Sequence, residues 1–198
     1  DVSHYTASAE HLRSYEQAAE QFSKFKMPAL LDLGDRHSHL IVGLLDGTGN
    51  DVAQDRLHAT NVAKFRQQIF DLNFAGNNQI HVEYKEGPGT QVDAPATKTL
   101  DNAVGHTGLA RAEGMYQKIV DAAQKIYEAD PQAKISVHLE GFSRGAVEVP
   151  LVARMIDERG IPDRSKEVRA LGADGKEVVT YERFHQAPGR TPMSVGLY

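Results

Sequence analysis

The alternation of apolar and polar positions along the chain predicts strands and helices that follow one another in turn. Apolar segments of strand length, continuous or alternating, lie at residues 39–45, 79–84, 135–139 and 193–197. Apolar residues at helical spacing lie between these strands, over residues 60–72, 109–127 and 147–156. Strands that alternate with helices indicate an α/β fold with a mainly parallel sheet.

Ahead of the first strand, residues 8–26 also carry apolar side chains at helical spacing. Ser8 and Pro28 are suitable start and stop signals for this helix. Its polar positions are mixed in charge, whereas a helix on a membrane surface usually has a basic polar face. We therefore expect an amphipathic helix that packs against the domain. On this basis the chain divides into an N-terminal helix and linker, residues 1–34, and a core domain, residues 35–198.

Three further segments carry local signals of their own. Residues 91–108 show little periodicity and contain Pro95, Gly105 and Gly108, which predicts a surface loop over the site. Pro150 falls inside the helix 147–156 and should kink or restrict it. Residues 168–171 and 177–181 flank an Asp-Gly turn, which predicts a hairpin.

Composition excludes several classes of function. The chain has 198 residues and a net charge of −5 without a long basic run, which argues against nucleic-acid binding. It has no cysteine, so disulfides and thiolate chemistry are excluded. No apolar run approaches the roughly 18 residues of a transmembrane segment. The chain begins at Asp1 and stops inside the last expected strand, so we expect it to be part of a larger unit.

The strongest candidate for chemistry is a Gly-x-Ser-x-Gly motif at residues 141–145. An apolar strand precedes it and an apolar-periodic helix follows it, which is the context of a nucleophile held on a sharp turn. The flanking glycines would let the strand and the helix approach closely. We therefore predict Ser143 as a nucleophile; the alternative is an ordinary tight turn.

A second glycine-rich loop, residues 46–51, follows the first strand at the end where open α/β sheets bind ligands. In a serine hydrolase, this loop would supply one backbone N–H of the oxyanion hole. The backbone N–H groups of Gly47 and Thr48 are the candidate donors from this loop. The N–H of Arg144, directly after the serine, is the candidate on the other side.

The same loop admits other interpretations. Asp46, Asn50 and Asp51 could hold a hard cation through their oxygen atoms. The glycines could cradle a phosphate, but no Gly-Lys-Ser/Thr follows, so a nucleotide P-loop is not supported. The loop could also be a simple turn that ends a buried strand. No cofactor is expected, and the remaining histidines do not show metal-binding spacing.

A serine hydrolase also needs a histidine base and an orienting carboxylate, which follow the serine in chain order in α/β-hydrolases. His185 is the one histidine after Ser143. Asp174 is a carboxylate candidate, although its Asp-Gly turn already explains it structurally. His185 could equally be a surface histidine. His138, inside the strand before the serine, is expected to be a satisfied core histidine.

Several ordered motifs together resemble the uncharacterised α/β-hydrolase family that includes bacterial type VI secretion phospholipase effectors. The motifs lie at residues 44–51, 60–62, 84, 87–90, 105–108 and 141–146. The resemblance implies a three-layer α/β-hydrolase sandwich, Ser143 as nucleophile, and hydrolysis of an ester in a phospholipid or other lipid. It further implies an antibacterial protein that leaves the producer's cytoplasm and is secreted or delivered into the periplasm of a target bacterium. A cognate immunity protein is the implied partner.

The chain also departs from this family. Members of the family carry their catalytic acid and base after the strand that corresponds to residues 194–198. The acid and the base of the family therefore have no matching positions in this chain. We expect the core to be truncated at its C-terminus, with the acid and base outside this chain or on a second chain. Glu148 and Pro150 make the helix after the serine atypical. A small-ester carboxylesterase on the same fold, or a non-catalytic interaction module, are the alternative functions.

Overall fold

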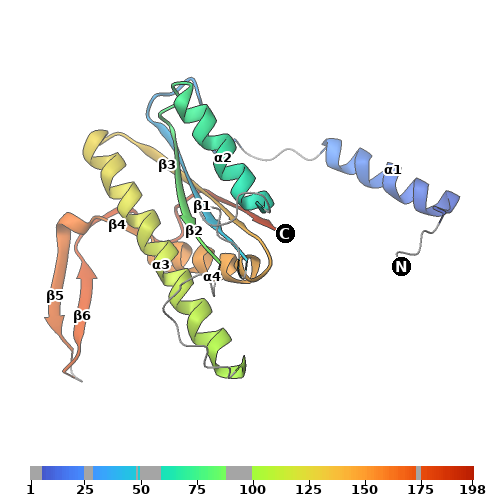
Figure 1. Ribbon diagram of the computed structural model, residues 1–198. Helices are drawn as coiled ribbons and strands as arrows, with labels where there is room; N and C mark the ends of the chain where they lie inside the picture. The colour runs from blue at the N-terminus through green and yellow to red at the C-terminus, as the bar shows by residue number, and fades with distance from the viewer. Residues whose placement is uncertain (1–5, 25–28, 48, 50–58, 88–99, 173–174) are drawn as a thin grey trace.

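The computed structural model describes residues 6–24, 29–47, 49, 59–87, 100–172 and 175–198. Its centre is a four-stranded sheet in the order β2-β1-β3-β8 (Figure 1). The strands are β1 (Ser38–Leu45), β2 (Ile80–Lys85), β3 (Lys134–Gly141) and β8 (Met193–Leu197). All three neighbouring pairs are parallel. The α/β class with a mainly parallel sheet is therefore confirmed.

Helices cover the two faces of this sheet. Successive residues of a strand point to opposite faces, and β1 shows this directly. Val42 and Leu44 pack with residues of α2 (Asn61–Phe74). Ile41 and Leu45 pack with residues of α3 (Leu100–Ala129) and α4 (Arg144–Arg159). The arrangement is a three-layer α/β/α sandwich in which the central strand β1 is apolar on both faces from Leu40 onward, as a strand buried on both sides requires.

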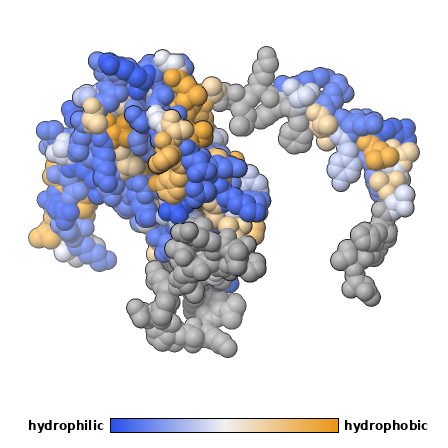
Figure 2. Space-filling view, turned by 45° about the horizontal axis from the view of Figure 1, so that its top comes forward, coloured by the Kyte–Doolittle hydropathy of each residue, from blue (hydrophilic) through white to orange (hydrophobic). Residues whose placement is uncertain are grey.

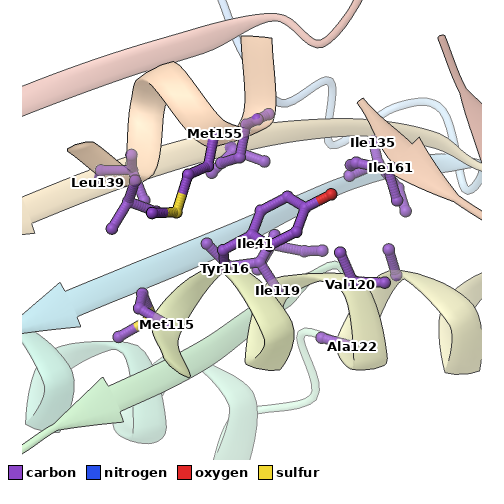
Figure 3. Close-up of a cluster of buried hydrophobic side chains, with 14 of the residues drawn as sticks. Ile41, Met115, Tyr116, Ile119, Val120, Ala122, Ile135, Leu139, Met155 and Ile161 are labelled. Carbon is purple, nitrogen blue, oxygen red and sulfur yellow. The ribbon is translucent and has the colours of Figure 1, made fainter. Parts of the chain in front are cut away.

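The larger part of the core lies between the sheet and the pair α3 and α4. Figure 3 shows Tyr116 and Ile119 of α3 beside Ile41 of β1, with Met155 of α4 nearby. Ile41 and Ile119 are fully buried, and burying each such side chain contributes about 1.5–3 kcal/mol. The Tyr116 hydroxyl donates to the Gly160 carbonyl at 3.0 Å. Burial raises the pKa of Tyr116 to about 12.

A smaller unit follows α4. Strands β4 (Ile161–Pro162) and β7 (Phe184–Gln186) pair antiparallel, and a short 3-10 helix, η1 (Arg164–Lys166), follows β4. Strands β5 (Glu167–Leu171) and β6 (Glu177–Tyr181) form an antiparallel hairpin that projects from the body (Figure 1). The predicted hairpin is thus confirmed, while Asp174 in its turn lies outside the described residues.

The N-terminal helix forms but does not pack as expected. Helix α1 (Ala9–Lys24) matches the predicted segment, yet Leu12 and Tyr15 on it are 53% and 75% exposed. Figure 1 draws α1 apart from the sheet, and Figure 2 shows hydrophobic atoms on its surface. Helical spacing defines an apolar face but supplies no surface to receive it, and α2, α3 and α4 already pack against the sheet.

One other expectation is wrong in part. The segment predicted as a loop, 91–108, is helical from Leu100, where α3 begins; residues 88–99 lie outside the described part. A glycine inside a helix costs only about 1 kcal/mol, which the rest of a 30-residue helix outweighs. Helix α4 runs unbroken through Pro150, which is exposed on the helix surface. Within the described residues, no helix is long and apolar enough to cross a membrane.

Candidate active site

Ser143 occupies the turn between β3 and α4 in an unusual backbone conformation. Its φ of 55° and ψ of −116° make it the sole non-glycine residue with a positive φ in the described part of the chain. Such a conformation is sparsely populated, costs of order 1–3 kcal/mol, and is concentrated at functional sites. The side chain is exposed and makes no capping hydrogen bond to α4. This is the geometry of a strained nucleophile turn.

The two glycines of the motif are required by close approach of backbones. A Cβ atom on Gly141 would lie 2.5 Å from the carbonyl carbon and oxygen of Gly145. A Cβ atom on Gly145 would lie 2.1 Å from the carbonyl oxygen of Leu45 at the end of β1. Real Cβ atoms do not approach other atoms this closely. The glycines therefore let α4 start directly against both β3 and β1.

The same approach brings the loop after β1 to the serine. The Phe142 N–H donates to the Leu45 carbonyl at 3.1 Å. A Cβ atom on Gly47 would lie 3.0 Å from Ser143 Cβ. Two motifs almost a hundred residues apart in sequence thus meet at the carboxyl end of the sheet. Thr48 lies outside the described residues.

Asp46 holds this loop from inside the protein. Its side chain is buried, and Oδ2 accepts hydrogen bonds from Thr60 Oγ1 at 3.1 Å and from the Tyr84 hydroxyl at 2.8 Å. Its Oδ1 accepts the Gly47 N–H at 2.9 Å. These contacts explain why the Thr60 and Tyr84 motifs accompany the glycine-rich loop. They also occupy the oxygens that a cation at Asp46 would need.

A metal centre at this loop receives no support from the described residues. Asn50 and Asp51 lie outside them. Within the described ranges, no group of three histidines and carboxylates is placed to hold a metal ion. The described part of the loop is anchored by hydrogen bonds beside Ser143.

The N-terminus of α4 offers a backbone donor next to Ser143. The N–H groups of Gly145 and Ala146 donate to the carbonyls of Phe142 and Ser143, at 2.9 and 3.1 Å. No described residue accepts a hydrogen bond from the Arg144 N–H. An N–H at a helix N-terminus lies at the positive end of the helix dipole, where it can stabilise a developing negative charge.

The residue that follows strand β8 pairs with Ser143 from the other side. The Ser143 N–H donates to the Tyr198 carbonyl at 2.9 Å, and the Tyr198 N–H donates to the Gly141 carbonyl at 3.0 Å. Backbone pairing with β8 therefore continues up to the serine itself. The end of β8 and the loop after β1 flank the turn on opposite sides.

The structure does not bring His185 to Ser143. The His185 ring stacks on Tyr127 at 4.2 Å, and its Nε2 lies 2.8 Å from Gln124 Oε1. The neighbouring Gln186 donates to the carbonyl of Ile135, near the start of β3. Because Ser143 follows the end of that strand, His185 lies about 25 Å away along it. Burial lowers the pKa of His185, although nearby Asp163 opposes the shift.

His138 has hydrogen-bond partners on both ring nitrogens, as expected for a satisfied histidine. Its Nδ1 lies 2.8 Å from Ser194 Oγ and its Nε2 lies 3.4 Å from Glu140 Oε2. The ring also makes an edge contact with Phe65. His138 is thus a satisfied histidine within the sheet, on strand β3.

A buried ion pair near the site has no signal in the sequence pattern. Glu148 of α4, only 5% exposed, accepts from Arg111 Nε of α3 at 2.8 and 3.1 Å through its two oxygens. This ion pair links α3 to α4 in the first turns of α4, five residues after Ser143. The two residues belong to different helices, so no local sequence pattern connects them. The one hint in the sequence is Glu148, a charged residue on a helix that is expected to pack against the sheet.

Comparison with known families identifies the class of protein. A model of the family described as T6SS, phospholipase effector Tle1-like, catalytic domain matches residues 39–188. The match covers more than half of the chain, so the chain belongs to this family of phospholipase effectors of type VI secretion systems. No curated protein and no solved structure matches the chain.

Proposed function

We propose that the chain contributes the nucleophile of a serine-dependent phospholipase. The observation that carries this proposal is the strained, exposed turn at Ser143 between β3 and α4. In the proposed reaction, Ser143 Oγ attacks the carbonyl carbon of an acyl ester while a base accepts its proton. Collapse of the tetrahedral intermediate releases the lysophospholipid alcohol, which takes the proton from the base. Water then hydrolyses the acyl-serine by the same two steps.

The oxyanion would be held by two backbone donors. The Arg144 N–H is the first, because no described residue accepts a hydrogen bond from it. The loop of Gly47 and Thr48 supplies the second, and the contact of Gly47 with Ser143 supports this assignment. Since the Gly47 N–H is bonded to Asp46, Thr48 is the preferred donor. Each such donor is worth about 10²–10³ in kcat.

The catalytic histidine and carboxylate would come from polypeptide outside this chain. Two contacts support this: His185 lies at the other end of the sheet, bonded to Gln124, and β8 pairs with the backbone of Ser143. A segment that continues β8, or a second chain that packs beside it, would arrive directly at the nucleophile. Asp174, the in-chain carboxylate candidate, lies outside the described residues.

Membership of the effector family supports the proposed place of action. We propose that the protein is cytoplasmic in the producer before export and attacks phospholipids from the periplasm of the target bacterium. A cognate immunity protein in the producer would then protect it from its own enzyme. A lipid substrate, rather than a small ester, is the one that the family indicates.

A fluorophosphonate probe tests the serine assignment. We expect the probe to label the wild-type chain when the polypeptide that carries the acid and base is present, and Ser143→Ala to abolish labelling. Ser14→Ala, which changes another exposed serine, should label like the wild type. An unlabelled wild-type protein in that complete preparation would contradict the proposal. Release of fatty acid from phospholipid vesicles, against turnover of a short-chain ester, then separates the lipase from the small-ester esterase.

A non-catalytic interaction module is the second candidate, and the position of His185 favours it. This candidate predicts that Ser143→Ala leaves partner binding unchanged and that no preparation hydrolyses phospholipids. The strained conformation at Ser143 would then serve no purpose, which is why the enzyme is the preferred proposal.

A further inference from the structure

Two cationic side chains near Ser143 have hydrogen-bond donors that find no acceptor among the described residues. Lys85 ends β2, and its carbonyl accepts the Asp46 N–H at 3.0 Å. It therefore lies beside the loop that touches Ser143. Its Nζ crosses to α3, where it would lie 2.9 Å from a Cβ atom on Gly114. Within the described residues, its ammonium makes no hydrogen bond or ion pair.

Arg111 lies next to this ammonium. It precedes Gly114 by three residues on α3, which places both on the same face of the helix. Arg111 Nε is paired with Glu148, but Arg111 Nη2 is buried without any hydrogen-bond partner among the described residues. Burial, followed by the charge of Arg111, lowers the pKa of Lys85. Glu148 is thus paired with Arg111, and its charge reaches Lys85 only through space, where it opposes the lowering of the Lys85 pKa.

Such an arrangement is costly unless an anion completes it. A buried cation is normally paired, and an unpaired buried donor costs about 1–3 kcal/mol. Glu148 neutralises one of the two positive charges, so one charge and several donors remain. Lys118, the next cation along α3, instead donates to the Tyr84 carbonyl at 2.9 Å. Glu86 is close enough to raise the pKa of Lys85, but within the described residues it makes no ion pair with it.

We propose that Lys85, with Arg111 behind it, binds the phosphate group of the phospholipid substrate. Lys85 is partly exposed and supplies the direct contact, while Arg111 adds positive charge and is held in place by Glu148. A phosphate offers several charged oxygens, which suits donors from two side chains. In a phospholipid, the phosphate lies only a few bonds from the acyl esters. A phosphate site near Ser143 therefore allows one substrate molecule to reach both the site and the serine. The assignment to a lipid headgroup rests on the proposed function above.

The test is direct binding to the 198-residue chain, observed through the NMR signals of lysine ¹³Cε groups. The probe is sn-glycero-3-phosphocholine, which carries the headgroup phosphodiester without acyl chains. We expect Lys85→Met to weaken binding at least about tenfold. Lys85→Arg, which keeps the charge, should stay within about threefold of the wild type. Lys118→Met is the matched control and should bind like the wild type.

Each outcome of this titration either supports or overturns the phosphodiester site. Binding that is unchanged in Lys85→Met, or lost equally in Lys118→Met, would overturn it. If inorganic phosphate binds at Lys85 but the phosphodiester does not, the site is one for free phosphate and the headgroup assignment is wrong. Should Lys85→Met fail to fold, Lys85→Gln makes the same test. Probe labelling of Ser143 is read separately, so loss of the nucleophile assignment and loss of the phosphate site remain distinguishable.

Discussion

The two ends of the central sheet differ in the strain of the backbone beside them. At the carboxyl end, Ser143 is exposed in a strained conformation and the Arg144 N–H has no acceptor among the described residues. At the amino end, His37 Nδ1 lies 2.8 Å from Asp130 Oδ2, and His185 stacks on Tyr127. Strain and free donors suit chemistry, whereas satisfied and buried groups suit stability. Removal of the Ser143 hydroxyl at the carboxyl end should therefore change activity, whereas removal of the Asp163 charge at the amino end should change stability.

The largest expected effect is on the nucleophile. Ser143→Ala should lower phospholipid hydrolysis by about 10⁴-fold or more, because the remaining groups cannot replace the attacking oxygen. Initial rates on phospholipid vesicles, with the complete acid and base present, measure this loss. The folded state should be as stable as the wild type, since the exposed hydroxyl caps no helix. Retention of more than about one per cent of activity would contradict the role of Ser143.

The next effect tests the close approach at the same end of the sheet. Gly145→Ala should destabilise the protein by about 3 kcal/mol or more, because its Cβ would collide with the Leu45 carbonyl oxygen 2.1 Å away. Gly175→Ala is the matched control, since nothing lies within 4 Å of its Cβ and only its positive φ opposes the change. We expect that control to cost about 1 kcal/mol. Urea unfolding of both variants gives the comparison, and equal costs would argue against the approach.

At the amino end, Asp163→Asn should destabilise the fold without reaching the nucleophile. Asp163 is fully buried and accepts from Ser165 at 2.6 Å and from Arg183 at 2.7 Å. Loss of its charge should cost about 2–3 kcal/mol, measured by thermal unfolding, while labelling of Ser143 stays unchanged.

The same carboxylate sets an acid limit. Hydrogen bonds from Ser165 and Arg183 hold the pKa of Asp163 at about 2, below its usual value of 3.8. The unfolded chain therefore binds this proton more readily than the folded one. The stabilisation is complete above about pH 4 and is lost as the pH falls towards 2. Asp163→Asn should flatten the stability profile in that range, and an unchanged profile would contradict the assignment.

The smallest effect distinguishes the ends most directly. His185→Gln should change labelling of Ser143 by less than about twofold, because the ring lies at the other end of the sheet. Burial lowers the pKa of His185, so its protonation destabilises the folded state. Stability should fall as the pH drops through about 6.5, the ordinary histidine pKa, and this slope should weaken in the variant. A tenfold loss of labelling would instead make His185 the base.

The elements that could be located well from the sequence are those whose signals are local. The strand, turn and helix around Ser143 follow from apolar pattern and two glycines, and the structure adds only the distances. The hairpin of β5 and β6 likewise follows from its turn residues. Where the signal is local but misleading, the prediction fails: residues 100–108 look like a loop because of their glycines, yet they continue α3.

Contacts that depend on residues distant in the sequence could not be predicted from it. The exposed apolar face of α1 could not be distinguished from a docked one, because its pattern says nothing about a receiving surface. The Arg111–Glu148 pair forms because α3 packs against α4. The position of Lys85, which makes no ion pair among the described residues, likewise depends on the packing of α3 against β2. His185 follows the serine in sequence, as a catalytic histidine would, but the chain returns it to the amino end.

The sequence by itself determined the α/β class, the sharp turn at Ser143 and the glycine-rich loop that accompanies it, because turns and short periodic elements obey local backbone and burial rules. Only the tertiary structure decided that Gly47 touches Ser143 and that Asp46 anchors the loop from within. It also decided that His185 lies far from Ser143 and that Glu148 pairs with Arg111 beside Lys85. Those relations are set by the register of parallel strands and by helix packing, which join residues that no local pattern connects.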